Sequence, residues 1–377
     1  MEHIRLFFAG DFCSKPSTSL IKVSDDLKEL IQSCDCKIIN FEVPLKPNIE
    51  LPIVHYERFF QSDDAPEFLK SLGFNLFSIS NNHMFDWEEE GFYKTVNALD
   101  GNVFGAGTYE EAYSVKTVNI KGKSIGFMGL CYSCGKKVFD IPLHKEGLAC
   151  SYINDLKVNH VIMEAKKKVD YLFILPHDGL EYIDIPMPGI IERYRDFIDY
   201  GADGVIGSHP HCPQGWETYK NKPIIYSLGN FFFNSKSNPD YRADKPHWYD
   251  GLCAVLDIVE TKIIINIYCV KNSNNTFLSL DNSEERIKHN NLICAYLKDN
   301  SLYKKYYEEF VNGIVCKQYI KLINGAFYDL GFKYSITALI RIFLRWLKND
   351  VSYNKRIVEY LGNQLYSSAL LTYFNKK

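Results

Sequence analysis

Residues 203–217 read DGVIGSHPHCPQGWE. In this stretch a short apolar run ends at Gly207, and His209 and His211 follow with Pro210 between them. We expect Gly207 to let the backbone turn and the proline to hold the two imidazoles at a defined spacing. Neutral imidazole is a common ligand of divalent transition metals, so the pattern favours a metal site at the end of a strand. Two surface histidines in a polar loop would give the same local pattern, so the rest of the chain has to decide.

The composition is that of an ordinary globular protein. The 377 residues are 46% hydrophobic and 24% charged, which allows two or three domains or one large α/β core with an appendage. The net charge of −3 does not suggest a nucleic-acid partner. The 11 cysteines form no recognisable disulfide framework. They favour free thiols in a reducing cytosol over a redox or metal role for Cys131-x-x-Cys134. No run reaches the roughly 18 apolar residues of a membrane-spanning helix, so we expect no transmembrane segment.

Polar side chains follow most of the apolar runs that we interpret as buried strands. The side chains at these ends are Asp11, Glu42, Asn82, His83, His177, His209 and His211. Ligand sites in α/β sheets lie at the carboxyl ends of strands, so we expect these groups to meet at one rim. A carboxylate such as Glu42 is costly to bury unless it meets a cation. Oxygen and nitrogen donors without a required thiolate suit one or two Mn, Fe or Zn ions, and paired ions are typical of hydrolytic centres.

The remaining pattern separates a mixed first part from a helical last part. Between the strands, apolar spacing predicts helices over residues 25–34, 62–72, 88–99, 154–168 and 190–200, and a β-hairpin around Gly122. Helices alone are predicted over 284–298, 301–323, 333–348 and 352–372. The apolar face of 336–347 is ordinary core packing or, as the alternative, a surface for a membrane or partner. We therefore predict a cytoplasmic protein, with peripheral membrane contact as the alternative.

Six motifs follow one another along the first part of the chain. They read Gly10-Asp11, Asn40-Phe41-Glu42, Asn81-Asn82-His83-x-x-Asp86, His177-x-Gly179-x-Glu181, Gly207-Ser208-His209-Pro210-His211 and Ser227-Leu228-Gly229-Asn230-Phe231. With these motifs in this order, residues 4–270 resemble the CapA family of capsule and poly-γ-glutamate biosynthesis proteins. The resemblance implies an α/β fold, a metallophosphatase-like layered α/β/β/α sandwich. We expect it to span residues 1–272, with an appended helical region over 283–377.

The resemblance also extends to the wider calcineurin-like phosphoesterases, and it implies two adjacent metal positions. Asp11 and His211 would hold one divalent ion, and Glu42 would stand where those enzymes place a bridging carboxylate. The ligands of the other ion would be Asn82, His177 and His209.

A catalytic pair and its surroundings are implied in the same way. His83 would face the substrate and protonate the leaving group or steady a phosphoryl oxygen. Asp86 would orient His83 or cap the following helix. Three further residues would surround the ligands, namely Glu181, Asn230 and Ser208.

Three features depart from the pattern. The wider superfamily usually shows Asp-x-His in its first motif, whereas this chain has Cys13 at the third position, so one metal position could lack an imidazole. Asp178 stands where many family members have tryptophan, which would alter the wall of the cleft. The membrane anchor common in the family is not expected here.

The function implied is a metal-dependent hydrolase or transferase of capsule or poly-γ-glutamate biosynthesis. It would act on phosphoryl or γ-glutamyl groups of a capsule-type polymer or its precursor. Two alternatives stay open. The same side chains could act as acid and base without a metal, as in an epimerase. The chain could also be a non-catalytic component of a polymer-synthesis or export complex, bound through its C-terminal helices. A fold by itself does not decide between them.

Overall fold

The computed structural model describes residues 3–50, 58–132, 138, 146–235, 245 and 247–310. The chain divides into two compact units, residues 1–297 and residues 298–377. The sheets and the candidate site belong to the first unit. Of the second unit, only residues 298–310 are described.

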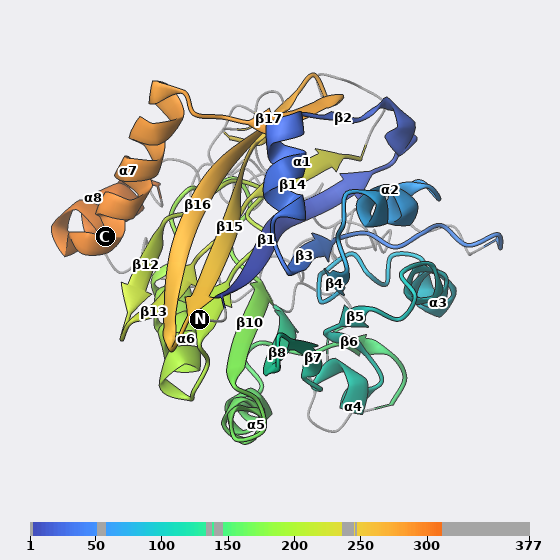
Figure 1. Ribbon diagram of the computed structural model, residues 1–377, viewed down its shortest axis with the longest axis horizontal. Coiled ribbons are helices and arrows are strands. Elements are labelled where there is room, and N and C mark those ends of the chain that lie inside the picture. The colour runs from blue at the N-terminus through green and yellow to red at the C-terminus, as the bar shows by residue number, and fades with distance from the viewer. Residues whose placement is uncertain are drawn as a thin grey trace, which may run out of the picture. The chain divides into compact units, whose positions relative to one another are not determined.

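A nine-stranded sheet organises the first unit, and its order in the described chain is β2-β17-β16-β15-β1-β3-β4-β5, with β14 paired to β1 (Figure 1). The bounds of these strands are β1 His3–Ser14, β2 Lys22–Val23, β3 Cys36–Phe41, β4 Leu76–Ser78, β5 Val103–Phe104, β14 Asn230–Asn234, β15 Asp250–Val259, β16 Lys262–Ser273 and β17 Phe277–Leu280. Strands β1, β3 and β4 run parallel, so their carboxyl ends lie at one edge.

A six-stranded sheet has the order β12-β13-β11-β10-β8-β7 among the described residues. Its strands are β7 Lys116–Ile120, β8 Lys123–Cys131, β10 Tyr171–His177, β11 Gly204–Ile206, β12 Trp216–Tyr219 and β13 Lys222–Ile225. Strands β8, β10, β11 and β13 are parallel. The predicted hairpin is confirmed as β7–β8. Its turn residues Lys121 and Gly122 have φ values of 49° and 76°, as a tight two-residue turn requires. A short two-stranded pairing joins β6 (Ala106–Gly107) and β9 (Ala149–Cys150).

The two large sheets pack face to face, as the alternating directions of the side chains along β1 show. Leu6 and Phe8 enter a buried cluster that includes residues of the second sheet, and the rings of Phe8 and Phe173 lie 5.8 Å apart. Phe7 and Ala9 point the other way, into a cluster shared with helices. Because successive side chains of a strand face opposite sides, one strand supplies both layers of the core.

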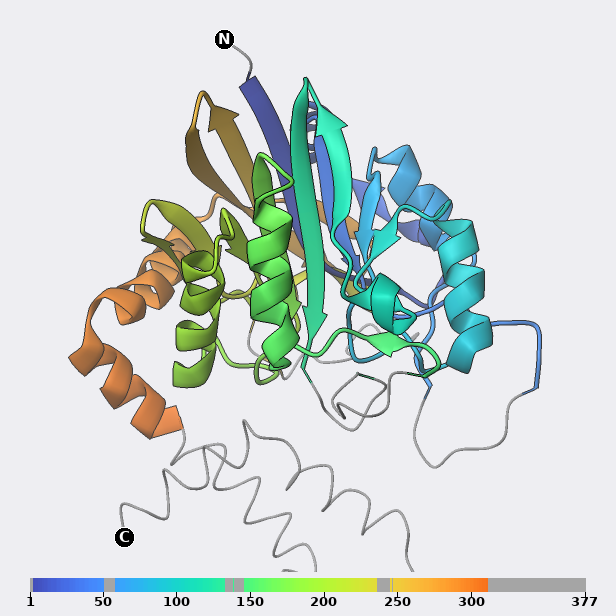
Figure 2. The ribbon, with the colours of Figure 1, turned by 90° about the horizontal axis from the view of Figure 1, so that it is seen from below.

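Helices cover the outer face of each sheet. Buried residues of α1 (Asp25–Gln32), α2 (Ala65–Ser71) and α3 (Glu88–Ala98) join the cluster on the outer face of the nine-stranded sheet. Helices α5 (Leu156–Lys166) and α6 (Pro188–Asp199) contact β10 and β11 and lie over the six-stranded sheet (Figure 2). The short elements are η1 (Thr18–Leu20) and α4 (Tyr109–Ala112). The predicted α/β class with two β layers between helical layers is confirmed.

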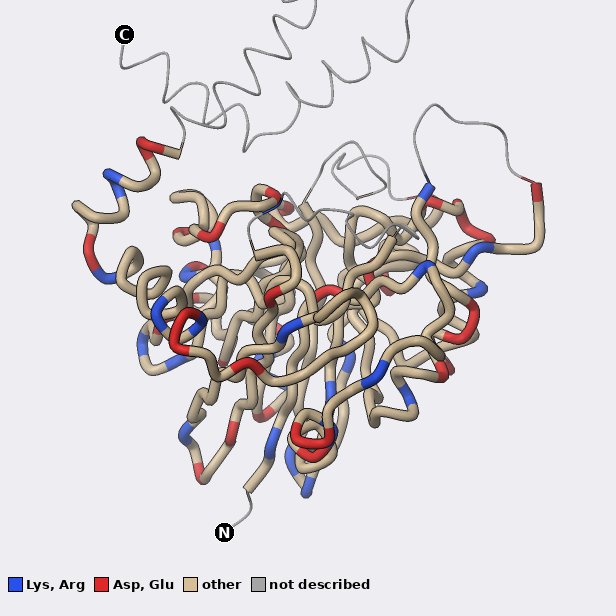
Figure 3. The backbone as a smooth tube through the Cα atoms, turned by 90° about the horizontal axis from the view of Figure 1, so that it is seen from above, with Lys and Arg blue, Asp and Glu red and all other residues tan. Residues whose placement is uncertain are grey.

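Helices follow the β part, as predicted. Helix α7 spans Glu284–Lys298, which matches the predicted 284–298, and α8 spans Asn300–Phe310. The rest of the predicted 301–323 helix, the helices over 333–348 and 352–372 and the apolar face of 336–347 lie outside the described residues. The boundary of the predicted domains, 1–272 and 283–377, stays a prediction. Among the described helices, none has the length and apolar character needed to cross a bilayer. Basic and acidic residues are interspersed along the described backbone (Figure 3).

Candidate metal centre

Strand β1 changes its neighbour at Gly10 and Asp11. Up to Ala9 it pairs with β15, and from Asp11 onward it pairs with β14, with register shifts on both sides of the change. A Cβ atom on Gly10 would lie 1.9 Å from the carbonyl oxygen of Gly229, so only glycine allows this approach. The prediction that Asp11 follows the end of the strand was therefore wrong. β1 continues to Ser14, and Asp11 lies at an irregularity inside it, fully buried.

The loop after β11 is bent at the histidines themselves. Gly207 does not provide the turn that we predicted, because its φ is not positive. A Cβ atom there would lie 2.1 Å from the carbonyl oxygen of Tyr226, so its role is to permit that approach. The positive φ values belong to His209 (99°) and His211 (56°). Such values are costly for residues with a side chain, and they concentrate at functional sites. The backbone N–H of His209 donates to Oδ2 of Asp11 at 3.1 Å, which joins this loop to β1.

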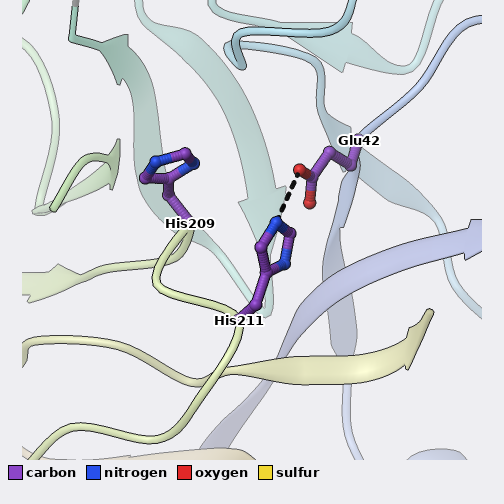
Figure 4. A group of neighbouring side chains, drawn as sticks. All are labelled: Glu42, His209 and His211. Carbon is purple, nitrogen blue, oxygen red and sulfur yellow. Dashed lines mark ion pairs between the residues drawn. The ribbon is translucent and has the colours of Figure 1, made fainter. Parts of the chain in front are cut away.

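Glu42, at the end of β3, lies at the centre of the converging donors. Its Oε1 is 3.5 Å from Nε2 of His211 (Figure 4). The same oxygen is 3.8 Å from Nε2 of His177. The same His177 nitrogen is 2.9 Å from Oδ1 of Asn82 and 3.1 Å from Nδ1 of His209. The structure thus brings together all six predicted ligands, five of them around Glu42 and His177 and the sixth, Asp11, 3.5 Å from Nδ1 of His211. Two overlapping groups have ligand atoms close enough for an ion, Glu42-His209-His211 and Asp11-Glu42-His177.

Neighbouring hydrogen bonds select the nitrogen that each histidine presents. Nδ1 of His211 lies 2.9 Å from Oδ1 of Asn230, an oxygen that can only accept, so Nδ1 carries the proton and Nε2 faces Glu42. Nε2 of His209 lies 2.9 Å from the hydroxyl of Tyr132, which leaves Nδ1 directed toward His177. The sequence analysis missed Tyr132. It stands inside the Cys131-x-x-Cys134 pair, and no local signal connects it with a histidine 77 residues away.

Asn40 is a further residue that the list of candidates did not include. Its side-chain amide donates to Oδ1 of Asp11 at 2.7 Å and lies 3.2 Å from Nδ1 of His177. It belongs to the Asn40-Phe41-Glu42 motif, so the signal was in the sequence. The hydrogen bond from Asn40 orients Asp11, because it engages Oδ1 and directs the other carboxylate oxygen, Oδ2, toward His211.

The buried surroundings of Glu42 and Asp11 disfavour the ionised form of their carboxylates. Glu42 is fully buried, and neither of its carboxylate oxygens has a hydrogen-bond partner among the described residues. Burial raises the pKa of Glu42 far above its usual range, and the nearby Asp11 raises it further. Burial also raises the pKa of Asp11. A bound cation would reverse both effects, so these residues suit a divalent metal.

The imidazoles are in the form that binds metal. Burial lowers the pKa of His177 well below its usual range, and the neighbouring His209 and His211 lower it further. Burial likewise lowers the pKa of His209 to about 3. Neutral imidazole has a free lone pair, so these two ligands are ready at neutral pH.

The predicted catalytic pair is formed by a direct contact. Nδ1 of His83 lies 2.8 Å from Oδ2 of Asp86, which also accepts a hydrogen bond from the backbone N–H of Phe59 at 3.1 Å. Helix α3 starts after Trp87 without a side-chain cap. Of the two roles predicted for Asp86, the contacts therefore support the orientation of His83.

The three surrounding residues differ in their contacts. Asn230 bonds His211, as described above, and Oγ of Ser208 lies 3.1 Å from Nδ1 of His177. Glu181 is only partly buried. Burial raises its pKa, but His211 and His209 lower it by more, so the net pKa is lowered.

The two departures from the motif pattern lead to different environments. Cys13 packs in a small buried cluster with Val43, Phe233 and Trp248, and burial raises the pKa of its thiol well above the usual range. A protonated thiol is a poor ligand, and Cys13 belongs to none of the possible ligand groups found among the described residues. Asp178 is buried and accepts from the N–H of Gly179 at 2.8 Å, and burial raises its pKa to about 6.

Comparison with known proteins identifies relatives of this arrangement. The family described as bacterial capsule synthesis protein PGA_cap matches residues 6–235, which include all six motifs. Capsule biosynthesis protein CapA of Bacillus anthracis is 27% identical over 208 residues, covering 53% of this chain and 51% of that protein. PGA biosynthesis protein CapA of Bacillus subtilis (strain 168) is 28% identical over 203 residues, covering 50% of this chain and 52% of that protein. The chain spans about half the length of these curated relatives. A solved structure described as a novel phosphatase from Mycoplasma pneumoniae shows 16% identity and a TM-score of 0.46, covering 76% of this chain and 97% of that one.

Proposed function

The chain belongs to the family described as bacterial capsule synthesis protein PGA_cap, and from this premise we propose that it is a metal-dependent hydrolase or transferase. Its substrate would be a capsule-type polymer or precursor, attacked at a phosphoryl or γ-glutamyl group. The observation that carries the proposal is Glu42, a fully buried carboxylate without a hydrogen-bond partner among the described residues, facing Nε2 of two histidines.

As the family resemblance implies, the ligands would divide into two sets that share Glu42. Asp11, Glu42 and His211 would hold one divalent ion, and Glu42 with Asn82, His177 and His209 would hold another. Mn, Fe and Zn are the metals that suit this mixture of oxygen and nitrogen donors. When bound, such ions polarise a phosphoryl or acyl oxygen and neutralise the charge that develops on it.

His83 would move the proton. Since Asp86 lies at its Nδ1, the proton that His83 exchanges with the leaving group is the one on Nε2. Asp86 is itself held by the N–H of Phe59, so the orientation of the imidazole is set before substrate arrives. The ring of Phe59 meets the His83 ring edge to face at 4.9 Å and limits its rotation.

Metal content is the first test. Protein purified without chelator should contain one or two equivalents of Mn, Fe or Zn, and the double variant His209→Ala/His211→Ala should lose them. Phosphodiesters and γ-glutamyl peptides are then screened as substrates. Absence of metal after reconstitution, or turnover that persists in chelator, would contradict the proposal and favour acid–base chemistry without metal.

His83→Ala separates chemistry from binding. It should lower turnover by about 10²–10⁴-fold, the usual contribution of a general acid, while the metal content stays at the wild-type value. Full activity in this variant would exclude the role assigned to His83.

Location and partners are proposals of the same kind. The nine described cysteines are buried and none of them is in a disulfide bond, which supports a reducing, cytoplasmic location. A polymer-synthesis complex would be contacted through the helices predicted beyond residue 310. Co-purification with the polymer-synthesis proteins of the same host should then be lost on truncation after residue 310, with unchanged metal content as the control.

A further inference from the structure

A second group of metal-ligand side chains lies outside the family motifs. Asp184 is on the segment after β10, His247 precedes β15, and His289 is on α7. One ligand atom of each lies within 4.8 Å of the other two. His247 and His289 also lie beyond residues 6–235, so the family match assigns them nothing.

The contacts of His247 resemble those of a supported metal ligand. Its Nδ1 lies 2.9 Å from Oδ2 of Asp250, so the carboxylate accepts from Nδ1 and leaves Nε2 as the free nitrogen. Metal-binding histidines usually have such a carboxylate on the other nitrogen, which fixes the ring orientation. His247 itself has a φ of 56°, a costly conformation for a residue with a side chain.

His289 completes the group from the helix. Its Nε2 lies 3.2 Å from Oδ2 of Asp184, and its ring stacks on that of His247 with centroids 3.8 Å apart. Arg286 approaches the other nitrogen, with Nη1 3.2 Å from Nδ1 of His289 and 3.5 Å from Oδ2 of Asp250. Since arginine only donates, the proton of the metal-free His289 sits on Nε2 and points to Asp184. A cation must displace that proton and loosen the arginine contact, so binding here is weaker than at a fully prepared site.

We propose that Asp184, His247 and His289 form a second metal site, structural in role, whose natural ion is Zn²⁺. Asp184, His247 and His289 would hold the ion, since two imidazoles and one carboxylate are ligands that suit Zn²⁺. The site ties α7 to the two segments that wall the main centre. Trp248, next to His247, lies 5.0 Å from the His211 ring, and Tyr182, two residues before Asp184, stacks on the same ring at 6.2 Å. Zinc at the second site therefore holds both aromatic walls in place.

The test is a titration of the full-length protein with Zn²⁺ against a chromophoric chelator. Wild type should bind one equivalent more than His289→Gln, whatever the main centre binds. The matched control is His160→Gln on the exposed face of α5, which should equal wild type. The quantity compared is the number of Zn²⁺ equivalents bound by wild type minus the number bound by His289→Gln. Metal binding at the main centre is measured separately with His209→Ala/His211→Ala, so failure of one site is distinguishable from failure of the other.

A second variant covers the case in which His289→Gln fails to fold. Asp184→Asn keeps an oxygen that accepts from Nε2 of His289 but removes the anionic ligand. It should keep the wild-type circular dichroism spectrum and bind the additional Zn²⁺ at least 10-fold more weakly, because losing even an outer partner of a ligand typically costs 10–100-fold and Asp184 is itself a ligand. If Asp184→Asn binds zinc as tightly as wild type, the proposal is overturned. Asp184, His247 and His289 would then form a hydrogen-bonded network and no metal site.

Discussion

Single residues at the candidate centre are held in states that cost stability. Glu42 has no hydrogen-bond partner among the described residues, and Asp11 and Glu42 raise each other's cost of ionisation. Leaving a buried polar group unsatisfied costs about 1–3 kcal/mol. The cost at Glu42 has an explanation if the site binds a cation that stabilises both carboxylates. The ionised side chain then serves function while it lowers the stability of the metal-free protein.

Glu42→Gln tests that interpretation. The variant removes a buried charge without changing the shape of the side chain. In chelator it should be more stable than wild type by about 1–3 kcal/mol, as measured by urea unfolding, and it should lose bound metal. His160→Gln, remote from the site and exposed, is the matched surface control. A variant that is less stable than wild type in chelator would show that Glu42 has a partner of another kind.

Because Asp178 is buried, we predict that the free energy of unfolding depends on pH. Its pKa is raised from 3.8 to about 6 by burial, so the folded state binds its proton more tightly than the unfolded state. The stabilisation from the protonated form is complete below pH 4 and is lost as the pH rises through about 6. A shift of this size corresponds to roughly 3 kcal/mol. Asp178→Asn keeps the acceptor for Gly179 and should be more stable than wild type at pH 7 but equal to it at pH 4, in urea unfolding with chelator. A difference that does not change with pH would exclude this cause.

At the scale of elements, the site depends on close contacts between strands and the segments beside them. The segment between β13 and β14 passes so close to β1 and to the end of β11 that Gly10 and Gly207 cannot carry a side chain. These contacts set where Asp11 points and where the His209–His211 loop begins. The pattern of apolar runs locates the strands, but the distance between two backbones is a tertiary property.

Gly10→Ala measures that constraint. The new methyl group would meet a backbone carbonyl oxygen, which cannot move aside as a flexible side chain does. We expect a loss of about 1–3 kcal/mol or more in the free energy of unfolding, and weaker metal binding because Asp11 is displaced. Gly189→Ala at the start of α6 has no atom within 4 Å of the new methyl group and should be neutral or stabilising by up to about 1 kcal/mol. Equal stability of the two variants would contradict the close approach.

At the scale of the whole molecule, the candidate ligands come from both sheets. Asp11 lies inside β1 of the nine-stranded sheet, and Glu42 and Asn82 follow strands of the same sheet. His177 ends β10 of the six-stranded sheet, and His209 and His211 follow β11 of that sheet. A cation bound by both sets joins the two β layers at their rim. Its binding free energy then opposes global unfolding, because the ligand set exists only when both layers are assembled.

Added metal should therefore raise the melting temperature of the first unit. At a free concentration 100-fold above Kd the stabilisation is about 2.7 kcal/mol, or roughly 4 °C for a unit of 297 residues. Scanning calorimetry with Mn²⁺ or Zn²⁺ measures the shift, and Glu42→Gln should remove the part due to the main centre. An unchanged melting temperature at saturating metal would contradict a site that spans the two sheets.

The sequence by itself determined the elements and the set of candidate ligands. Apolar runs with polar ends located the main strands, and six ordered motifs indicated the family. Helical spacing located α1, α2, α3, α5, α6 and α7 but not the short α4. All of these are local signals, since strand and helix periodicity and a motif are each contained within about 20 residues. For the same reason, the strand-end placement was correct for Glu42 and His177 but wrong for Asp11, which lies inside β1.

Only the tertiary structure decided how those residues act on one another. The change of neighbour at Asp11, the positive φ values of His209 and His211 and the nitrogen that each imidazole presents depend on partners far along the chain. Asp11 and His209 are 198 residues apart, and Tyr132 and His209 are 77 apart. The group of Asp184, His247 and His289 likewise joins three segments that carry no common motif. Contacts of this kind arise when the two sheets pack, so no local pattern contains them.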